Sequence, residues 1–259
     1  MTDRSVDAIV LAAGEGSRMK SALPKPLHLL GGRPMVFYVL EALHDAGVRH
    51  AVVVVGYRST DVINAIVPEV PDGLTVSYVN QFERRGTGDA TAVGLVGLDC
   101  EGESLPNDVL VVPGDAPLVR AETLSMLIEC HHDRGDAATV LSTVMDDPTG
   151  YGRVVRDGNG RVTGIVEQLE LSAEQLGIHE VGTSIYCFHR ELLASSLQEL
   201  SPTNSKGEYY LTDVVAILAD EGHSVGVVGV DDPSEVAGIN NQAQLECAET
   251  TLANRALSQ

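Results

Sequence analysis

Two basic side chains accompany a glycine-rich segment near the start of the chain. The segment has the sequence LAAGEGSRM over residues 11–19, with Arg18 inside it, and Lys25 follows as one of only three lysines in the chain. The small residues let the backbone approach a ligand closely and leave its N–H groups exposed. Because guanidinium and ammonium groups both bind phosphate oxygens, this combination predicts a triphosphate site. The alternative is a tight strand-to-helix turn with two solvated cations.

Two common nucleotide-binding motifs do not fit the sequence. A dinucleotide fingerprint requires G-x-G-x-x-G, and Met19 stands where the third glycine belongs. The phosphate loop of NTPases requires G-x-x-x-x-G-K-[ST], which no stretch of the chain supplies. The sequence therefore disfavours a Rossmann dehydrogenase and a phosphate-loop hydrolase.

A carboxylate follows a second apolar segment. Asp115 comes after VLVV at residues 109–112, through Pro113 and Gly114. In an open α/β sheet this position is the carboxyl end of a strand and faces the same crevice as the glycine loop. A hard oxygen ligand there suits Mg²⁺. The pair Asn240-Asn241, taken without further context, is typical of a helix N-cap.

These residues require a scaffold of alternating strands and helices. Short segments rich in Val, Ile and Leu, typical of strands buried on both faces, occupy residues 8–11, 51–55, 74–79 and 109–112. Between them, apolar residues recur at helical spacing. These are Met35, Val39 and Leu43, then Val62 and Ile66, then Leu124, Leu127 and Ile128. The alternation predicts a doubly wound sheet.

The second half of the chain predicts antiparallel strands and a final helix. The segment DGNG at residues 157–160 separates apolar stretches at 153–155 and 162–166, which is typical of a tight hairpin. Residues 241–259 predict a helix. No repeat and no long linker divides the 259 residues, so we expect one domain.

The charge balance narrows the class of partner. The net charge is −20, from 17 Lys plus Arg against 37 Asp plus Glu, and such a field repels nucleic acid. Phosphorylated substrates must then be met by local cations, backbone N–H groups and a divalent metal. The four cysteines match no metal-ligand spacing and are expected to be scattered buried thiols in a reducing compartment. Without a basic leader or an apolar stretch of about 20 residues, we expect a cytoplasmic protein with no membrane span.

Seven motifs, in order, resemble one enzyme family. They are LAAGEGSRM, PKPLHLLGGRPM, GTGDA, PGDAPL, DPTGYGRVVR, NSKGEYYLTDV and AGINNQAQL. Over roughly residues 5–248 they resemble the pyrophosphorylase domain of the bifunctional N-acetylglucosamine 1-phosphate uridyltransferases. The resemblance implies a Rossmann-like, doubly wound mixed sheet of the nucleotidyltransferase (GT-A-like) type, with a small antiparallel sugar-binding part. It also implies a nucleotide-binding half at about 5–120, a sugar-binding half at about 121–240 and a C-terminal helix at 241–259.

The resemblance further implies the reaction. A uridylyl group would pass from UTP to N-acetylglucosamine 1-phosphate, with Mg²⁺ as cofactor, giving UDP-N-acetylglucosamine and pyrophosphate. The sugar phosphate is already nucleophilic, so we expect the catalytic groups to be the cations Arg18 and Lys25 instead of a base. The implied metal ligands are Asp115 and Asn240. No nucleic acid or membrane partner is expected, and the oligomeric state stays open.

The remaining site residues follow from the same resemblance. Uracil offers an N–H donor between two carbonyl acceptors, and the amide of Gln81 can pair with part of that edge. Glycines let a sugar ring approach the backbone, and the carboxylate of Glu167 can accept hydrogen bonds from hydroxyl groups. The implied nucleotide-binding residues are Leu11, Ala12, Ala13, Gly14, Gln81, Gly86 and Thr87. The implied sugar-binding residues are Gly114, Gly152, Glu167 and Gly182.

Other residues of these motifs are expected to be structural. Tyr151 and Arg153 lie around the turn of the GYGR motif. Residues 208–210 are expected to open a helix that continues through Thr212 and Asp213, with packing as their function.

Three positions depart from the family pattern. Gly182 stands where the family usually has an asparagine that contacts the sugar, Asp89 stands where a histidine is usual, and Pro113 lines the nucleotide crevice. Loss of one substrate hydrogen bond typically costs about 0.5–1.5 kcal/mol. The same chemistry on another sugar 1-phosphate or nucleotide is therefore an alternative. A catalytically silent nucleotide-sugar sensor is a further alternative, and the intact Arg18, Lys25, Asp115 and Asn240 argue against it. The chain ends before any hexapeptide repeat, so no acetyltransferase activity is expected.

Overall fold

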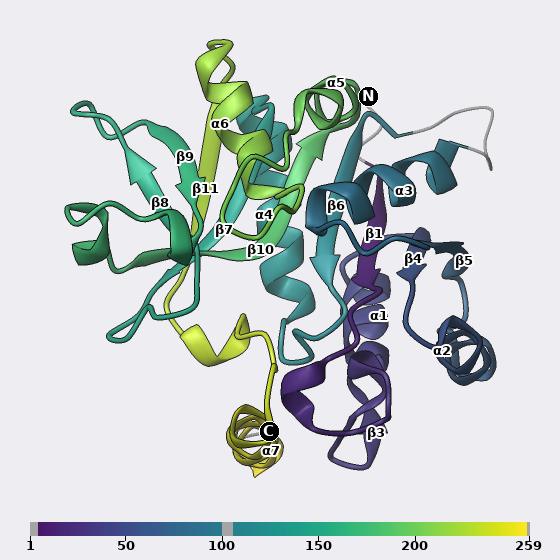
Figure 1. Ribbon diagram of the computed structural model, residues 1–259. Coiled ribbons are helices and arrows are strands. Elements are labelled where there is room, and N and C mark those ends of the chain that lie inside the picture. Colours follow the sequence, from purple (N-terminus) through teal and green to yellow (C-terminus); the bar gives the residue numbers. More distant parts are fainter. Residues whose placement is uncertain (1–4, 100–105, 258–259) are drawn as a thin grey trace.

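A mixed β-sheet forms the centre of the molecule in the computed structural model, which describes residues 5–99 and 106–257 (Figure 1). Its main path has the strand order β11-β7-β10-β6-β1-β4-β5. The strands on this path are β1 (Val6–Ala12), β4 (His50–Val55), β5 (Thr75–Asn80), β6 (Asp108–Pro113), β7 (Ala138–Val144), β10 (Glu180–His189) and β11 (Val225–Val230). The four strands predicted from apolar segments are confirmed to within a residue or two.

One strand of this path, β10, runs in the direction opposite to the other six. β6, β1, β4 and β5 run parallel to one another. β10 runs antiparallel between β6 and β7, and β11 is parallel to β7. β8 (Arg153–Arg156) and β9 (Val162–Val166) form the predicted antiparallel hairpin, which joins β10 where Arg153 pairs with Val181. The predicted doubly wound mixed sheet and its hairpin are therefore confirmed.

Helices cover both faces of this sheet. They are α1 (Met35–Asp45), α2 (Ser59–Ile66), α3 (Thr87–Asp99), α4 (Ala121–Arg134), α5 (Arg190–Glu199), α6 (Thr212–Asp220) and α7 (Gln242–Leu257). Ala8 and Val10 of β1 share a core with α1, α2 and α4, whereas Ile9 shares a second core with α3, α5 and α6. Because successive strand residues point to opposite faces, one apolar strand supplies both cores.

Glycines let α3 lie close to the sheet. A Cβ atom at Gly94 would lie 2.5 Å from Cγ2 of Ile9, and one at Gly97 would lie 2.6 Å from Cγ1 of Val79. Both distances are shorter than van der Waals contact, so this approach requires glycine. The N-terminus of α3 is thereby held beside the strand ends where the predicted ligand-binding residues lie.

The C-terminal helix α7 packs beside the glycine loop. Leu245 and Ala248 of α7 join Met19 in a small apolar cluster. The side-chain Oδ1 of Asn241 accepts a hydrogen bond of 2.9 Å from the backbone N–H of Gln244, which is the geometry of an N-cap. The N-cap interpretation of the asparagine pair therefore holds for Asn241.

The segment before α6 is not helical, which corrects the expectation for residues 208–210. Helix α6 begins at Thr212. The backbone N–H of Tyr209 donates to the carbonyl of Arg85 at 2.7 Å, and its own carbonyl accepts from the N–H of Gly88 at 2.8 Å. These backbone groups are paired with the start of α3, so they are not available for a helical turn.

The cysteines are less uniformly buried than expected. Cys187 is buried in β10, Cys130 is half-buried in α4, and Cys247 is exposed in α7; all three are free thiols. Cys100 lies outside the described residues. Within residues 5–99 and 106–257, no helix is both long and apolar enough to cross a membrane.

Candidate active site

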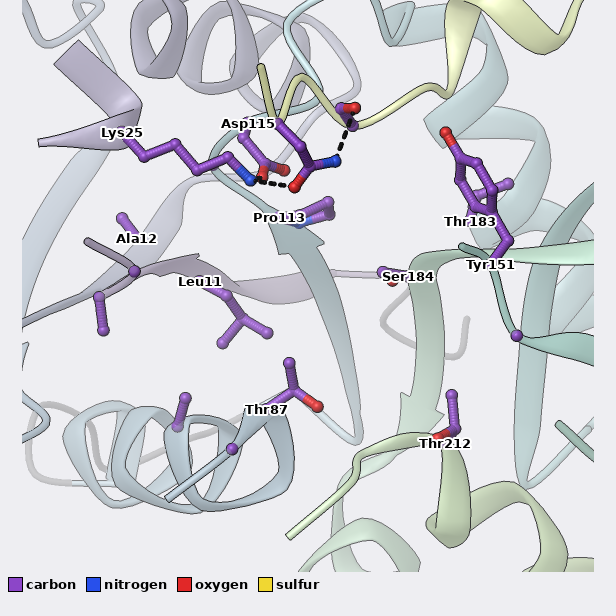
Figure 2. Close-up of a pocket in the computed structure, with 18 of the residues that line it drawn as sticks. Leu11, Ala12, Lys25, Thr87, Pro113, Asp115, Tyr151, Thr183, Ser184 and Thr212 are labelled. Carbon is purple, nitrogen blue, oxygen red and sulfur yellow. Dashed lines mark hydrogen bonds and ion pairs between the residues drawn. The ribbon is translucent and has the colours of Figure 1, made fainter. Parts of the chain in front are cut away.

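A cleft of about 470 Å³ opens at the carboxyl ends of β1 and β6 (Figure 2). Every residue that the sequence assigned to the site lines this cleft. They are Leu11, Ala12, Ala13, Gly14, Arg18, Lys25, Gln81, Gly86, Thr87, Gly114, Asp115, Gly152, Glu167, Gly182 and Asn240. Pro113, noted as a departure from the family pattern, lines it as well. The fold thus brings motifs from the whole length of the chain to one place.

The basic and acidic groups of the cleft meet at one point. Nζ of Lys25 donates a hydrogen bond of 2.7 Å to Oδ1 of Asn240 and another to Oδ2 of Asp115. Nη2 of Arg18 donates to the same Asn240 oxygen at 2.8 Å. Only 14% of the Lys25 side chain and 19% of the Asp115 side chain are exposed. The two predicted catalytic cations and the two predicted metal ligands therefore form one cluster. Figure 2 shows Lys25 reaching Asp115 within it.

Backbone contacts assemble this cluster. Gly16 has a φ of +71°, and a Cβ atom there would lie 2.8 Å from Cβ of Lys25. Only glycine therefore lets the segment that carries Lys25 cross so close to the loop. The N–H of Ile239 donates to the carbonyl of Asp115 at 2.9 Å, which ties the segment before α7 to the turn after β6. Asn240 is thereby placed beside Asp115.

The oxygens of the cluster suit a hard divalent cation. Oδ2 of Asp115 and Oδ1 of Asn240 both face one ammonium nitrogen, so they already share a position for positive charge. Mg²⁺ prefers such oxygens and completes its coordination with water and substrate phosphates. No group of three or more His, Cys, Asp or Glu side chains suited to a metal occurs in the described part of the chain. A magnesium site here would thus rely on Asp115, Asn240 and the substrates.

The loop before α3 forms one end of the cleft. Gln81 is 5% exposed, and its Nε2 donates to the carbonyl of Gly86 at 3.1 Å and to Oδ2 of Asp89 at 2.8 Å. Oγ1 of Thr87 accepts a hydrogen bond of 3.0 Å from the N–H of Leu211. The residues that the resemblance assigns to uracil are therefore held in place by the protein itself.

Glycines and a half-buried carboxylate form the opposite wall. The N–H of Gly182 donates to the carbonyl of Gly152 at 3.0 Å, and a Cβ atom at Gly182 would lie 3.1 Å from Cδ1 of Ile165. Oε1 of Glu167 accepts a hydrogen bond of 3.1 Å from Oγ1 of Thr212. Desolvation raises the pKa of Glu167 in spite of this bond. Glu167 is thus a stronger proton and hydrogen-bond acceptor than an exposed glutamate.

Several cleft residues escaped the sequence analysis. Tyr151, expected to be structural, lines the cleft, and burial together with the charge of Asp115 raises the pKa of its phenol. Ser184 also lines the cleft, with a φ of +64° at an irregularity in the pairing of β10. The other such residues include Glu208 and also Thr183 and Thr212, which Figure 2 labels. The neighbouring Gly152 is a signal that would have found Tyr151, whereas no local pattern marks Ser184.

Arg153 has the structural role that was expected. Its guanidinium is buried and donates to the carbonyl of Tyr151 and, at 3.0 Å, to Oε1 of Gln168. The same Gln168 oxygen accepts from the N–H of Gly150 at 3.1 Å. These bonds fix the turn that carries Tyr151 and Gly152 into the cleft.

A third cation reaches the glycine loop. Nη1 of Arg84 donates to Oε2 of Glu15 at 2.9 Å, which links the loop before α3 to the glycine loop. Arg84 lines the cleft, and about half of its side chain is exposed. The pair lies 69 residues apart in the sequence, so no local motif pointed to it.

Comparison with known proteins agrees with this geometry. The chain matches the MobA-like NTP transferase domain family over residues 8–218. It is 43% identical over 240 residues to bifunctional protein GlmU of Carboxydothermus hydrogenoformans, covering 93% of this chain and 51% of that protein. It is 41% identical over 256 residues to bifunctional protein GlmU of Thermobifida fusca, covering 99% and 52%. The corresponding protein of Streptomyces coelicolor is 43% identical over 256 residues, covering 98% and 52%.

These matches cover most of this chain but only part of each relative. The chain spans about half the length of the curated relatives it matches. The family match covers most of the chain and includes the glycine loop, Asp115 and Glu167. This chain therefore belongs to the MobA-like NTP transferase domain family.

Proposed function

We propose that this chain is a Mg²⁺-dependent uridylyltransferase that joins UTP to N-acetylglucosamine 1-phosphate and releases pyrophosphate. Membership of the NTP transferase family supports nucleotidyl transfer, and the resemblance of the sequence motifs to the uridyltransferases supports this substrate pair. The observation that carries the proposal is the meeting of Arg18, Lys25, Asp115 and Asn240 beside the glycine loop. In a chain of net charge −20, such a local cluster is what two phosphorylated substrates require.

The proposed reaction is an in-line displacement at the α-phosphorus of UTP. A phosphate oxygen of the sugar 1-phosphate forms the new P–O bond, and the bond from the α-phosphorus to the pyrophosphate oxygen breaks. The attacking oxygen is already anionic, so no side chain has to remove a proton. The barrier lies in bringing two anions together and in stabilising the charge that develops on pyrophosphate.

Arg18 and Lys25 supply that stabilisation. One positive charge about 4 Å from a phosphate oxygen contributes about 4 kcal/mol at an effective dielectric constant of about 20. On binding of the phosphates, Lys25 exchanges its contacts with Asp115 and Asn240 for phosphate oxygens. Asp115 and Asn240 would hold Mg²⁺, which would supply further positive charge beside the phosphates.

The rest of the cleft orients the two substrates. Backbone groups of residues 11–14 hold the nucleotide, and Gln81 with the start of α3 holds the base. Glu167 and the glycines of the opposite wall hold the sugar, so that the nucleotide-binding and sugar-binding halves meet at the α-phosphorus. Tyr151 lines the same cleft.

One observation favours a second candidate for the sugar. Gly182 has no side chain, and a Cβ atom at this position would lie closest to the methyl and methylene groups of Ile165. A sugar 1-phosphate that needs no hydrogen bond from this position would fit the same wall. The chemistry is unchanged, and only the identity of the acceptor differs.

The experiment that tests the proposal is release of pyrophosphate, measured for a grid of nucleoside triphosphates against sugar 1-phosphates. We expect UTP with N-acetylglucosamine 1-phosphate to give the highest kcat/KM and EDTA to abolish it. Asp115→Asn should lose metal-dependent turnover by orders of magnitude, whereas Asp72→Asn, an exposed position outside the cleft, should not. Turnover led by another sugar would favour the second candidate, and no turnover with any pair would refute the proposal.

A further inference from the structure

Asp89 lies next to Gln81, in the first turn of α3. Its side chain is 9% exposed, and its Oδ2 accepts a hydrogen bond of 2.8 Å from Nε2 of Gln81. The same amide nitrogen donates to the carbonyl of Gly86 at 3.1 Å. Neither acceptor carries a hydrogen, so the reverse orientation would set the Gln81 carbonyl against two oxygens. The two partners therefore fix the direction of the amide.

A second set of bonds holds Asp89 itself. Nε and Nη2 of Arg85 donate to its Oδ1 at 3.1 and 2.6 Å. The guanidinium carbon of Arg85 lies 5.6 Å from the centroid of the Tyr209 ring, which keeps the arginine in place. The backbone N–H of Gln81 donates to the carbonyl of Val55 at 2.8 Å, so both ends of the network are anchored. The two carboxylate oxygens of Asp89 thus have separate partners.

This network decides what Gln81 can offer a ligand. Both amide hydrogens are used within the protein, so the capacity that remains is the acceptor Oε1. At ring position 3 uracil presents an N3–H donor, whereas cytosine presents a bare N3 acceptor and carries its donor on the exocyclic N4. An acceptor placed opposite N3 therefore pairs with uracil and repels cytosine.

We propose that Asp89 is a positioning residue that holds the Gln81 amide with its acceptor toward the base and thereby selects uracil over cytosine. The inference rests on the proposed uridylyl transfer and adds the origin of its choice of base. Asp89 acts through Gln81 and does not itself touch the nucleotide.

The substitution Asp89→Asn replaces one hydrogen-bond acceptor of the network with a donor and leaves the size of the side chain nearly unchanged. Arg85 keeps the carbonyl oxygen of the new amide at the Oδ1 position, so a nitrogen takes the place of Oδ2 and faces Nε2 of Gln81. Two donors then oppose each other, and Gln81 is driven to turn over and present hydrogens to the base. We expect the ratio of kcat/KM for UTP over that for CTP to fall by about tenfold or more.

Two further variants make the test specific. Asp61 lies on α2, outside the cleft, and forms an ion pair with Arg58. Asp61→Asn removes one negative charge, as Asp89→Asn does, and should leave the ratio unchanged. Arg85→Met keeps the Asp89 carboxylate but releases its Oδ1, and should lower the ratio by a smaller factor. Kd values for UTP and CTP with Mg²⁺, measured by calorimetry without the sugar phosphate, should follow the same order. Thermal melting of each variant checks that it is folded.

The outcomes separate this inference from the proposed function. Uridylyl transfer by the unmodified enzyme, with a ratio that falls in Asp89→Asn and not in Asp61→Asn, supports a positioning role. If the unmodified enzyme uses UTP but Asp89→Asn loses UTP and CTP turnover equally, Asp89 is merely structural and the inference is wrong. If Asp89→Asn does not fold, an unchanged ratio in Arg85→Met has the same meaning. If the unmodified enzyme takes no UTP, the proposed function and the inference fail together.

Discussion

The ammonium group of Lys25 lies 2.7 Å from the side-chain oxygen of Asn240, a residue 215 positions further along the chain, and also bonds Asp115. Lys25 therefore occupies the place between the two oxygens that we propose as magnesium ligands. A lysine that contacts these oxygens competes with the metal until phosphate is bound. The same residue should then affect metal binding and turnover in opposite directions.

We expect Lys25→Met to bind Mn²⁺ more tightly than the unmodified protein does, because the competing ammonium is gone. Its turnover should fall by as much as about three orders of magnitude, since one charge near the phosphates contributes about 4 kcal/mol. Mn²⁺ titration by electron paramagnetic resonance and pyrophosphate release measure the two effects. Lys20→Met, at an exposed lysine outside the cleft, is the matched control. Equal Mn²⁺ affinity in Lys25→Met and the unmodified protein would contradict the competition.

Glu167→Gln should stabilise the protein at neutral pH. Desolvation raises the pKa of Glu167 in the folded state, so the folded state favours its protonated form. Its contribution to the free energy of unfolding is therefore fully present below the unfolded pKa and declines as the pH rises through the folded pKa. Glutamine keeps an acceptor for Thr212 without the charge. We expect Tm to rise by on the order of 2–4 °C at pH 7.5 and to be unchanged near pH 4, while KM for the sugar phosphate increases.

Glu170 serves as a control because it is exposed and its pKa is shifted in the opposite direction. The hydrogen bonds that Glu170 accepts from Ser205 lower the pKa of Glu170. Its contribution to stability is present above the unfolded pKa and is lost as the pH falls through the folded pKa. Glu170→Gln should therefore leave Tm unchanged or slightly lower at pH 7.5. A rise of Tm in both variants would show that general charge reduction, not the burial of Glu167, is responsible.

Gly86→Ala should damage the base-binding end of the cleft. Gly86 has a φ of +118°, and a Cβ atom there would lie 2.4 Å from the carbonyl oxygen of Tyr209. The collision and the backbone strain together should cost about 1–3 kcal/mol of stability and weaken UTP binding. Gly47→Ala has a φ of +95° with open space around the new methyl group, so it isolates the backbone strain. Equal loss of UTP affinity in both variants, by calorimetry, would refute the collision.

Gly182→Asn should improve use of N-acetylglucosamine 1-phosphate. Gly182 lines the cleft, and one additional hydrogen bond of about 0.5–1.5 kcal/mol from the new carboxamide to the sugar corresponds to a KM about two- to tenfold lower. Its Cβ atom would lie 3.1 Å from Cδ1 of Ile165, so some stability is lost as that side chain shifts. Gly182→Ala adds the crowding without the amide. If both variants raise KM equally, the sugar does not approach this wall.

The local pattern of the sequence predicted part of the fold and the first residues of the candidate site. Apolar segments fixed β1, β4, β5 and β6, because a strand buried on both faces requires an uninterrupted apolar run. The glycine loop and the carboxylate of Asp115 could be located because ligand-binding residues of an open α/β sheet follow the carboxyl ends of its strands. The resemblance of the motifs then supplied residues such as Gln81 and Glu167.

Only the tertiary structure decided which groups face each other. The orientation of the Gln81 amide depends on Asp89 and Arg85, and the conformation of Ser184 depends on strand pairing in β10. Residues 208–210 do not form the predicted helix because the backbone of Tyr209 is hydrogen-bonded to Arg85 and Gly88 at the start of α3. Lys25 and Asn240 meet because the turn after β6 binds the segment before α7. Hydrogen bonds act over about 3 Å, so such pairings depend on how distant elements pack and leave no pattern along the chain.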